Sequence, residues 1–556
     1  MKRILFCIIL ASLTFVGCKD WLDINYDPNN ATVNVVSIGL YLPDCQTSIA
    51  ALLNNSSTQY QLSHHTTKGG GVGGGFPFLN GLLQTQNSSG FWQDLYRISA
   101  NLVIIRDKAQ ELNSKSYEGI AQTLLVHNFN RLVDMFGDIP YTEAILGAEL
   151  YQPVYDKAQD VYAALLSDID KAIANLTAAK SGEQQQISTL HELSKFDVMA
   201  KGDIDKWIRF ANSLKLRMLM RISGVQSVNS QVAAIANSCL NPNEMMFANP
   251  GYLKLSGKMN PFYVNFGWNQ NDAVASGHGF YRPTRCFVDM LRINNDPRLR
   301  VYVEPRLNLG ADDSGRADYE KWGLLDERYI GIPYGQVDPP LDPRTTAIGL
   351  GILGLSDNMN VAPVSNAPIM GGFEVQFFLA EAALTGIISG GDAAAQAYYE
   401  AGVKGVFNYL DVPLRASFTP GAGVIGQYAF VRPPISGTAL QAATEYLTQN
   451  NAFCNWDLMT TQAQKLEAIA SQKWISLFGV NPIEAWNEFR RLDLPPLGSS
   501  IQGQQRRNIS ILLYPQTEFN YNAINVEKVD PDRDVYTTLL FWDKVNPIVP
   551  VVPDYL

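Results

Sequence analysis

The chain has 556 residues, of which 46% are hydrophobic and 17% are charged, a balance typical of a folded globular protein. With 43 Lys and Arg residues against 53 Asp and Glu residues, its formal net charge is −10. Nucleic-acid binding is therefore not expected, because neutralising phosphates requires concentrated positive charge and the sequence has no basic cluster.

The first residues follow the pattern of a bacterial secretory signal. Two basic residues precede an apolar run over residues 4–13, which is too short to cross a bilayer ~30 Å thick. We predict a lipoprotein signal peptide over residues 1–17, with Cys18 as the acylated N-terminus of the mature protein. Phe15 stands where such signals usually carry Leu, so plain secretion and a buried, unlipidated Cys18 stay open. Lipidation would hold the protein on a membrane face outside the cytoplasm.

Residues 18–35 are polar and rich in Asn, which predicts a tether between the lipid and the folded part. The segments that follow, over about residues 36–235, have helical periodicity. Apolar residues recur at steps of three and four, which is typical of amphipathic helices that bury one stripe. The stripes comprise Leu95, Ile98, Leu102, Ile105 and Ala109; Leu125, Phe129, Leu132 and Phe136; Tyr162, Leu165, Leu166, Ile169, Ile173 and Leu176; and Trp207, Phe210, Ala211, Leu214, Met218 and Ile222.

From about residue 240 to 370 the pattern breaks into short runs separated by Gly, Pro and Asn, which predicts loops with minor strands. Helical stripes return over about residues 373–495. Small residues at the contacts favour stacked, antiparallel helical hairpins. We therefore predict a mainly α protein with one scaffold of tetratricopeptide-like hairpins and an irregular middle part, although no 34-residue repeat is evident.

The sequence offers little support for cofactor, metal or nucleophile chemistry. Cys45, Cys239, Cys286 and Cys454 are scattered, so they are predicted to be small buried hydrophobes rather than disulfides or zinc ligands. Two strings satisfy a dinucleotide-binding glycine pattern, beginning at Gly69 and at Gly349, but neither stands between a strand and a helix. The first is better interpreted as a loop tip. We expect no cofactor.

Two acidic clusters could hold calcium through oxygen ligands. They are Asp312-Asp313 and the group Asp530, Asp532 and Asp534. Neither has the glycine and the terminal glutamate of an EF-hand loop, so solvated acidic turns are favoured and no metal site is assigned.

A set of segments in a fixed order resembles the SusD/RagB family of outer-membrane nutrient-binding lipoproteins of Bacteroidota. The segments are Cys18-Lys19-Asp20-Trp21-Leu22-Asp23; Phe91-Trp92 through Tyr96 to Asn101; Phe136-Gly137-Asp138-Ile139-Pro140-Tyr141; Trp207 with Phe210-Ala211-Asn212-Ser213-Leu214 and Arg217; Asp296-Pro297-Arg298-Leu299; Glu374-Val375-Gln376-Phe377 with Leu379-Ala380-Glu381-Ala382; Gln472-Lys473-Trp474; Glu484-Ala485-Trp486-Asn487-Glu488 with Arg490-Arg491; and Tyr514-Pro515 with Glu518. The resemblance implies one mostly helical domain, over residues 36–556, rather than the several domains that length alone suggests.

Within these segments, Glu484 and Glu488 stand one helical turn apart with Arg490 and Arg491 close behind. A pair of carboxylates could hydrolyse a glycoside across a cleft, but neighbours on one helix beside two guanidinium groups fit an ion-pair network better. Trp92, Trp207, Trp474 and Trp486 fall within helical stripes and are expected to pack.

The resemblance implies a non-enzymatic receptor that captures oligosaccharides at the cell surface and passes them to a SusC-like TonB-dependent transporter. Ligand residues should come from the irregular part, where aromatic faces can stack on sugars and amides can bind hydroxyls. The candidates are Tyr263, Phe266, Trp268 and Tyr281, with Asn265, Asn269 and Arg282 as polar partners and with Phe76 and Phe78 as a second wall. Trp268 is the first choice, and its replacement by Ala is expected to leave thermal stability nearly unchanged.

Three other functions stay open. Peptide capture would use the same architecture with exposed backbone-bonding edges. A surface hydrolase is disfavoured because no acid and base pair stands out. A structural subunit without a ligand is the third.

Overall fold

The structure is a computed structural model that describes residues 38–54, 57–70, 76–147, 150–182, 192–271, 273, 275–304, 329–336, 347–348, 364–412, 437–503, 506–529, 532–544 and 546–549. The predicted signal peptide and tether, with Cys18, lie outside these ranges. So do residues 71–75 of the first glycine string, the whole of the second, Asp312, Asp313 and Asp530.

Long helices occupy the segments with helical stripes, as predicted. The helices of the N-terminal half are α2 (Ile38–Asn54), α3 (Ser57–Leu62), α4 (Pro77–Asn80), α5 (Ser89–Glu111), α6 (Lys115–Phe136), α7 (Ala158–Lys180), α8 (Leu193–Phe196), α9 (Ile204–Ile222) and α10 (Asn229–Ile235). Every member of the first two predicted stripes is buried, on α5 and α6. Gly137 ends α6 as expected, with a φ of 74° that only glycine adopts without strain.

The second helical part begins one residue before the predicted boundary. Its helices are α16 (Gly372–Leu384), α17 (Gly391–Leu410), α19 (Ala439–Thr448), α20 (Gln462–Ser476) and α21 (Pro482–Leu492), followed by the short α22 (Gln516–Tyr521) and α23 (Ala523–Val529). Short 3₁₀ helices cover Thr85–Ser88, Ala236–Ser238 and Trp456–Leu458. Thr438 and Thr461 form capping boxes with Gln441 and Gln464, which explains where α19 and α20 begin.

The middle part has minor strands, as predicted, and also short helices that were not predicted. Its strands are β2 (Met245–Ala248), β3 (Tyr281–Pro283), β4 (Val303–Glu304), β5 (Ala347–Ile348) and β6 (Ala367–Gly371), and its helices are α11 (Pro261–Phe266), α12 (Ser276–Phe280), α13 (Arg285–Ile293) and α14 (Leu299–Tyr302). A further strand, β1 (Thr66–Lys68), belongs to the N-terminal part. The strands pair antiparallel as β1–β3, β2–β6 and β4–β5.

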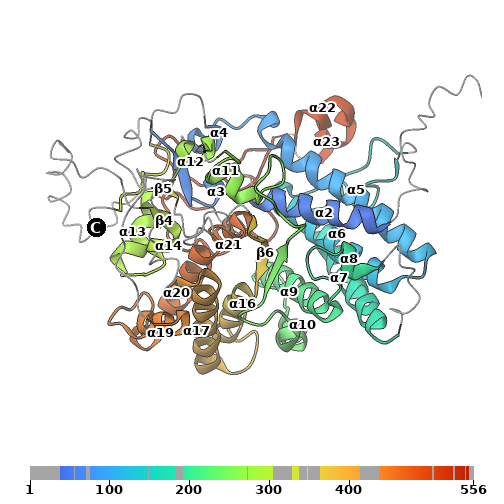
Figure 1. Ribbon diagram of the computed structural model, residues 1–556. Helices are drawn as coiled ribbons and strands as arrows, with labels where there is room; N and C mark the ends of the chain where they lie inside the picture. Colours follow the sequence, from blue (N-terminus) through green and yellow to red (C-terminus); the bar gives the residue numbers. More distant parts are fainter. Residues whose placement is uncertain are drawn as a thin grey trace, which may run out of the picture.

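Neighbouring helices stack side by side in an arc that runs from α5, α6, α7 and α9 through α16 and α17 to α19 (Figure 1). The two helices α6 and α7 lie very close together at Gly119, where an added Cβ would come within 2.7 Å of Leu176 Cγ and 3.1 Å of the Ala172 carbonyl oxygen. A glycine is therefore required on α6 by the backbone approach of α7.

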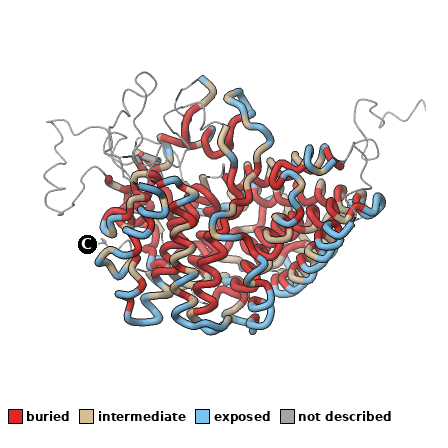
Figure 2. Tube along the Cα trace, turned by 60° about the horizontal axis from the view of Figure 1, so that its bottom comes forward, coloured by how far each residue is buried: buried red, intermediate tan, exposed pale blue. Residues whose placement is uncertain are grey.

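The buried apolar side chains form two clusters, and α16 contributes to both of them. Phe378 and Leu379 of this helix join the cluster around the N-terminal helices, whereas Phe373 and Phe377 join the cluster around α17, α19 and α20. A helix that is apolar on all sides belongs in the interior. Figure 2 shows the resulting arrangement, with buried residues inside the helical stack and exposed residues on its outer turns. Within the described residues, no helix is both long enough and apolar enough to cross a membrane.

Candidate functional site

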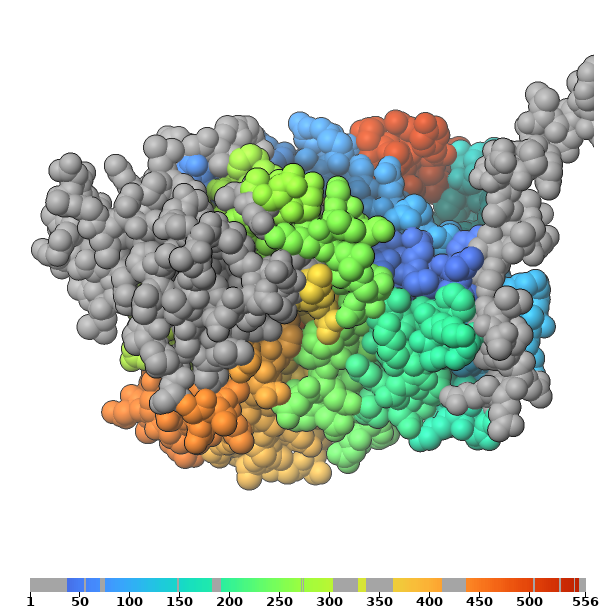
Figure 3. Space-filling view, viewed as in Figure 1, coloured from blue at the N-terminus to red at the C-terminus, as the bar shows by residue number. Residues whose placement is uncertain are grey.

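The residues predicted to bind a ligand lie in one corner of the molecule, where chain segments far apart in sequence meet. Strand β1 pairs with β3, so that Lys68 lies opposite Tyr281 and the Gly69 N–H donates to the Phe280 carbonyl over 2.8 Å. Helix α3 packs against β1 and helix α12 against β3, while α4 lies next to α3 and α11 next to α12 (Figure 1). In the space-filling view, the green middle segment lies against the blue N-terminal helices at the surface (Figure 3).

Local sequence explains why this corner folds as it does. The Asn260 side chain accepts from the backbone N–H groups of Phe262 and Tyr263, and Pro261 occupies the first position of α11. Thr284 caps α13 through the Phe287 N–H and also donates to the His64 carbonyl over 2.6 Å. The cap therefore fixes the start of α13 and ties it to the N-terminal part of the chain.

Five of the nine predicted ligand residues are buried, which corrects the picture of an accessible platform around Trp268. Trp268 is 2% exposed, and its ring packs against Tyr263 and His278 at centroid distances of 6.0 and 5.3 Å. Phe266 meets Tyr60 edge to face at 5.3 Å. Because these faces are used for packing, the residues support the corner from within. The buried five are Tyr263, Phe266, Trp268, Arg282 and Phe78.

The other four predicted residues, Asn265, Asn269, Tyr281 and Phe76, are half-buried. Phe76 and Tyr281 meet edge to face with centroids 6.1 Å apart, and Lys68 Nζ lies 5.6 Å from the Phe76 ring. The structure thus brings the predicted second wall to the predicted middle segment. Asn269 Oδ1 accepts from two backbone N–H groups of its own loop, so this oxygen serves the turn.

Sequence reasoning missed Phe280, which is 44% exposed and stands directly before Tyr281. Its backbone carbonyl is fixed by Gly69, so the exposed ring is attached to a rigid strand pair. The available signal was the pair of adjacent rings, Phe280 and Tyr281, directly after the glycine-rich residues 277–279. Phe76, Phe280 and Tyr281, which we call the aromatic rim, are the partly exposed rings of this corner among the described residues.

His278, a histidine packed inside this corner, is uncharged near neutral pH. Burial lowers the pKa of His278 to about 4, helped by the positive charge of Arg282, and the ring Nδ1 lies 2.7 Å from the Phe266 carbonyl. His278 is therefore neutral near pH 7. The partly exposed rings of this corner can hold a ligand by stacking, with Lys68 beside Phe76 as a positively charged neighbour.

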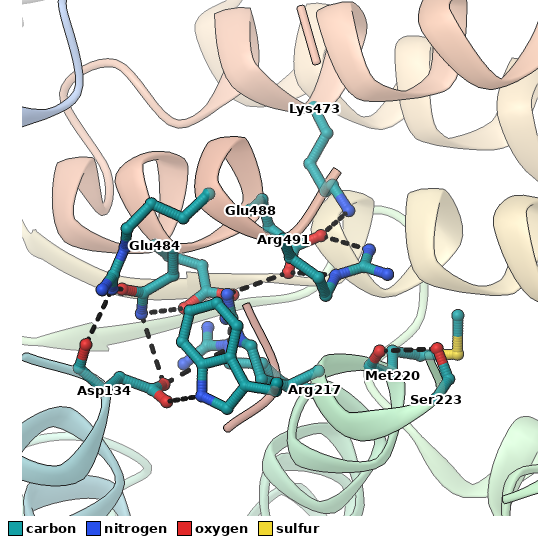
Figure 4. A network of polar contacts seen from close by, with 12 residues as sticks. Asp134, Arg217, Met220, Ser223, Lys473, Glu484, Glu488 and Arg491 are labelled. Carbon is teal, nitrogen blue, oxygen red and sulfur yellow. Dashed lines mark hydrogen bonds and ion pairs between the residues drawn. The ribbon is translucent and has the colours of Figure 1, made fainter. Parts of the chain in front are cut away.

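A second candidate, the carboxylate pair on α21, lies in a buried ion network at the centre of the helical stack (Figure 4). Arg491 donates two bonds of 2.6 Å to Glu381 and one of 2.6 Å to Glu488. Lys473 and Arg221 also bind Glu488, and Arg221 donates to Glu484. The prediction of an ion-pair network is confirmed by these contacts.

Burial and neighbouring charge set the protonation of the network. Burial alone raises the pKa of Glu488, but Arg491, Lys473 and Arg221 outweigh it and hold that pKa well below its usual range. Burial raises the pKa of Glu374 to about 7 despite the guanidinium of Arg217 2.7 Å away. Both Glu484 and Glu488 are enclosed and bound to cations, so neither presents a carboxylate to a substrate.

The remaining sequence predictions concern packing. The four tryptophans assigned to helical stripes are all buried, which confirms their packing role. The four cysteines of the described residues are unpaired with one another and buried, as predicted. Asp534 caps a turn by accepting from the N–H groups of Tyr536 and Thr537. Within the described ranges, no three His, Cys, Asp or Glu side chains are grouped as metal ligands.

Four surface cavities of about 470 to 550 Å³ are lined by residues other than the nine predicted ones. The aromatic rim is therefore not part of the wall of any of these four cavities. The largest of the four lies on the helical scaffold between α5, α6 and α7.

Comparison with known proteins adds a family and a fold. Residues 32–515 match the SusD-like family described as "Starch-binding associating with outer membrane". No curated protein is similar enough in sequence to match.

Among solved structures, the chain is similar to a SusD-like protein from Bacteroides thetaiotaomicron, with 22% identity, a TM-score of 0.67 and coverage of 91% of this chain and 99% of that one. It is also similar to a chitin-binding SusD homologue from Flavobacterium johnsoniae, with 20% identity, a TM-score of 0.64 and coverage of 92% and 100%. A third, from Bacteroides vulgatus, is described as an outer membrane protein probably involved in nutrient binding, with 20% identity, a TM-score of 0.64 and coverage of 92% and 100%.

Proposed function

Because the chain belongs to the SusD-like family, we propose that it is a cell-surface lipoprotein that binds oligosaccharides and passes them to a SusC-like TonB-dependent transporter. The observation that carries the proposal is the family match over residues 32–515, in a family described as starch-binding and associated with the outer membrane. The chitin-binding relative supports a carbohydrate ligand. We propose binding without catalysis, and the enclosed carboxylates of α21 agree with that.

We propose that the ligand binds at the aromatic rim. The rings of Phe76, Phe280 and Tyr281 can pack on the C–H faces of sugar units. We propose Asn265, a half-buried residue of α11 that lies against Gly277, as a hydrogen-bonding partner. Trp268 and Tyr263 act from beneath by holding α11 and the following loop in place.

Calorimetric titration with neutral hexasaccharides tests this assignment. The panel consists of hexamers of α-1,4-glucose, β-1,4-N-acetylglucosamine, β-1,4-glucose and β-1,4-xylose. The double variant Phe76→Ala/Tyr281→Ala is expected to weaken binding by ~10-fold or more, because two stacking faces are removed. The matched control is Tyr151→Ala/Tyr521→Ala, which removes two rings that are 78% and 71% exposed elsewhere.

The two failures are distinct. Unchanged affinity in the rim variant would overturn the site and leave the function standing. Failure of the wild-type protein to bind any hexasaccharide, together with binding of a tryptic peptide mixture, would replace the carbohydrate ligand by a peptide.

The lipid anchor is a separate part of the proposal, since Cys18 lies outside the described residues. Cells expressing the wild-type chain are expected to incorporate labelled palmitate into it and to retain it in the outer-membrane fraction. Cys18→Ala should abolish both. Release of wild-type protein without label would overturn the anchor.

The transporter partner needs its own test. A TonB-dependent transporter, identified by mass spectrometry, is expected to co-purify with the wild-type protein from gently solubilised membranes. Absence of such a transporter from the purified sample would overturn the partnership.

A further inference from the structure

The cavity on the helical scaffold is separate from the aromatic rim. It has a volume of about 550 Å³ and lies between α5, α6, α7 and the loop that follows α6. Ligand pockets in proteins commonly enclose about 300–1,000 Å³, so this cavity has room for a small ligand. Its apolar lining comes from Val103, Leu125, Val126, Phe129, Tyr141 and Ile145.

The loop that closes one side of the cavity is held in place before any ligand binds. Asp156 accepts from the Tyr141 N–H, the Thr142 N–H and the Thr142 hydroxyl over 2.8 to 2.9 Å. The Tyr141 hydroxyl donates to Asp168 over 2.5 Å. Ile145 adopts a φ of 63°, a conformation that β-branched residues rarely adopt and that costs ~1–3 kcal/mol. The chain therefore maintains a strained wall at this cavity.

Aromatic rings line the cavity beside this wall. Phe129 meets Tyr141 edge to face at a centroid distance of 4.9 Å and an angle of 87°, and Tyr96 meets the other side of Phe129 at 5.9 Å. Phe129 is buried, whereas Tyr141 is half-buried and forms part of the cavity lining. Tyr141 is therefore the ring that can meet the C–H groups of a ligand, with Phe129 packed behind it.

The charged groups at the mouth neutralise one another. Arg106 Nε donates to Asp107 over 2.8 Å, and Lys171 Nζ lies 2.7 Å from Asp168. Two cations and two anions leave no net charge, so an ionic ligand of either sign would meet repulsion from one member of each pair. A neutral ligand rich in hydroxyl groups could bond to both carboxylates and both cations, because hydroxyls donate as well as accept.

We propose that this scaffold cavity is a second carbohydrate-binding site, which accepts one end of a neutral oligosaccharide through its pyranose ring. The proposal rests on the proposed function for the class of ligand, but on different residues. A sugar is favoured over an apolar peptide side chain because its hydroxyls can bond to the two ion pairs at the mouth while its ring occupies the apolar lining, whereas an apolar side chain can use the lining alone.

The experiment measures how many hexasaccharide molecules bind to each protein molecule, with the same four-member panel and full-length mature protein. Asp107→Ala/Lys171→Ala removes one anion and one cation from exposed positions at the mouth. Its matched control, Lys108→Ala/Glu111→Ala, removes an exposed ion pair of 2.6 Å from α5 that does not line the cavity. Gln110→Trp, at an exposed helical position, blocks the mouth without touching the apolar lining.

Wild-type protein and the control are expected to bind two molecules of at least one hexasaccharide. Both cavity variants should bind one, with the second site weakened by ~10-fold or more. A wild-type stoichiometry of one that both cavity variants retain would overturn the second site while the proposed function stands. Loss of all binding in the cavity variants would instead overturn the rim assignment, and binding of peptides but no glycan would overturn both.

Discussion

Trp268 stands in a segment rich in Asn and Gly, yet only 2% of its surface is exposed. The composition of its segment predicts a surface position for Trp268. Nothing in the neighbouring sequence indicates that the side chain is buried instead. Its neighbour Tyr263 comes from α11 and its other neighbour, His278, from α12, so the burial depends on how two short helices pack. By contrast, tryptophans within regular stripes, such as Trp207, were predictable because helical spacing fixes their face.

Trp268→Ala is expected to lower the free energy of unfolding by about 3–5 kcal/mol, because it removes a large buried side chain and leaves a cavity. This replaces the expectation of unchanged stability. Phe280→Ala, at a ring that is 44% exposed, should cost no more than about 1 kcal/mol. Urea unfolding followed by circular dichroism measures both. Equal stability of Trp268→Ala and wild type would contradict the buried position.

Stability should fall as the pH is lowered from 6.5 towards 4.5. Burial lowers the pKa of four histidines, to about 3 for three of them and about 4 for the fourth: His64, His65, His127 and His278. The unfolded chain therefore takes up these protons first, and stability is lost below pH 6.5. Burial raises the pKa of Asp134 and of Asp493 to about 6 and that of Glu374 to about 7, so these three carboxyls act in the opposite direction.

Four histidines against three carboxyls leave a net loss of roughly 2 kcal/mol per pH unit between pH 5.5 and 4.5. Urea titrations at several pH values measure this slope. His127→Gln should reduce the slope by ~1.4 kcal/mol per pH unit, because one proton no longer distinguishes the two states. A flat profile for the wild type would contradict the neutral, buried histidines.

At the scale of elements, long helices were predictable and short ones were not. The stripes of α5, α6, α7 and α9 extend over several turns, which distinguishes a helix from chance. Helix α13 spans only nine residues between Gly- and Pro-rich segments, so its two turns gave too few repeats to recognise. The meeting of β1 with β3 could not be predicted either, because it joins segments more than 200 residues apart.

The contact between α6 and α7 predicts that replacing a helical glycine by alanine lowers the stability of the protein, which is the reverse of the usual effect. Replacing glycine by alanine within a helix usually stabilises it by up to ~1 kcal/mol. Gly119→Ala should instead cost about 1–3 kcal/mol, since the new Cβ would meet Leu176 at 2.7 Å. Gly90→Ala on α5, where no atom lies within 4 Å, is the matched control and should be neutral or stabilising. Thermal unfolding of both variants measures the difference, and equal stabilisation would contradict the close approach.

At the scale of the whole molecule, the buried ion network connects α6, α9, α16, α20 and α21. The sequence indicated the members of α21 as a support network, but not that Arg221 of α9 would reach them across 263 positions. Residue spacing within one helix cannot indicate a partner that comes from another helix.

Arg221→Met should lower the free energy of unfolding by about 3–5 kcal/mol, because Glu484 and Glu488 would lose a buried partner. Lys180→Met, which breaks an exposed pair with Asp205, should cost no more than about 1 kcal/mol. Unfolding followed by both tryptophan fluorescence and circular dichroism measures the change. Coincident transitions would support the prediction of one domain over residues 36–556, and two separate transitions would contradict it.

The same network bears on the order in which the polypeptide emerges from the ribosome. A nascent chain that ends before α16 contains Arg217 and Arg221 but not Glu374, Glu484 or Glu488. Burying guanidinium groups without these acids would be strongly unfavourable. Although Asp134 of α6 is an acidic partner of Arg221 in the first half, we expect α9 to reach its final packing only after α16 and α21 have been made.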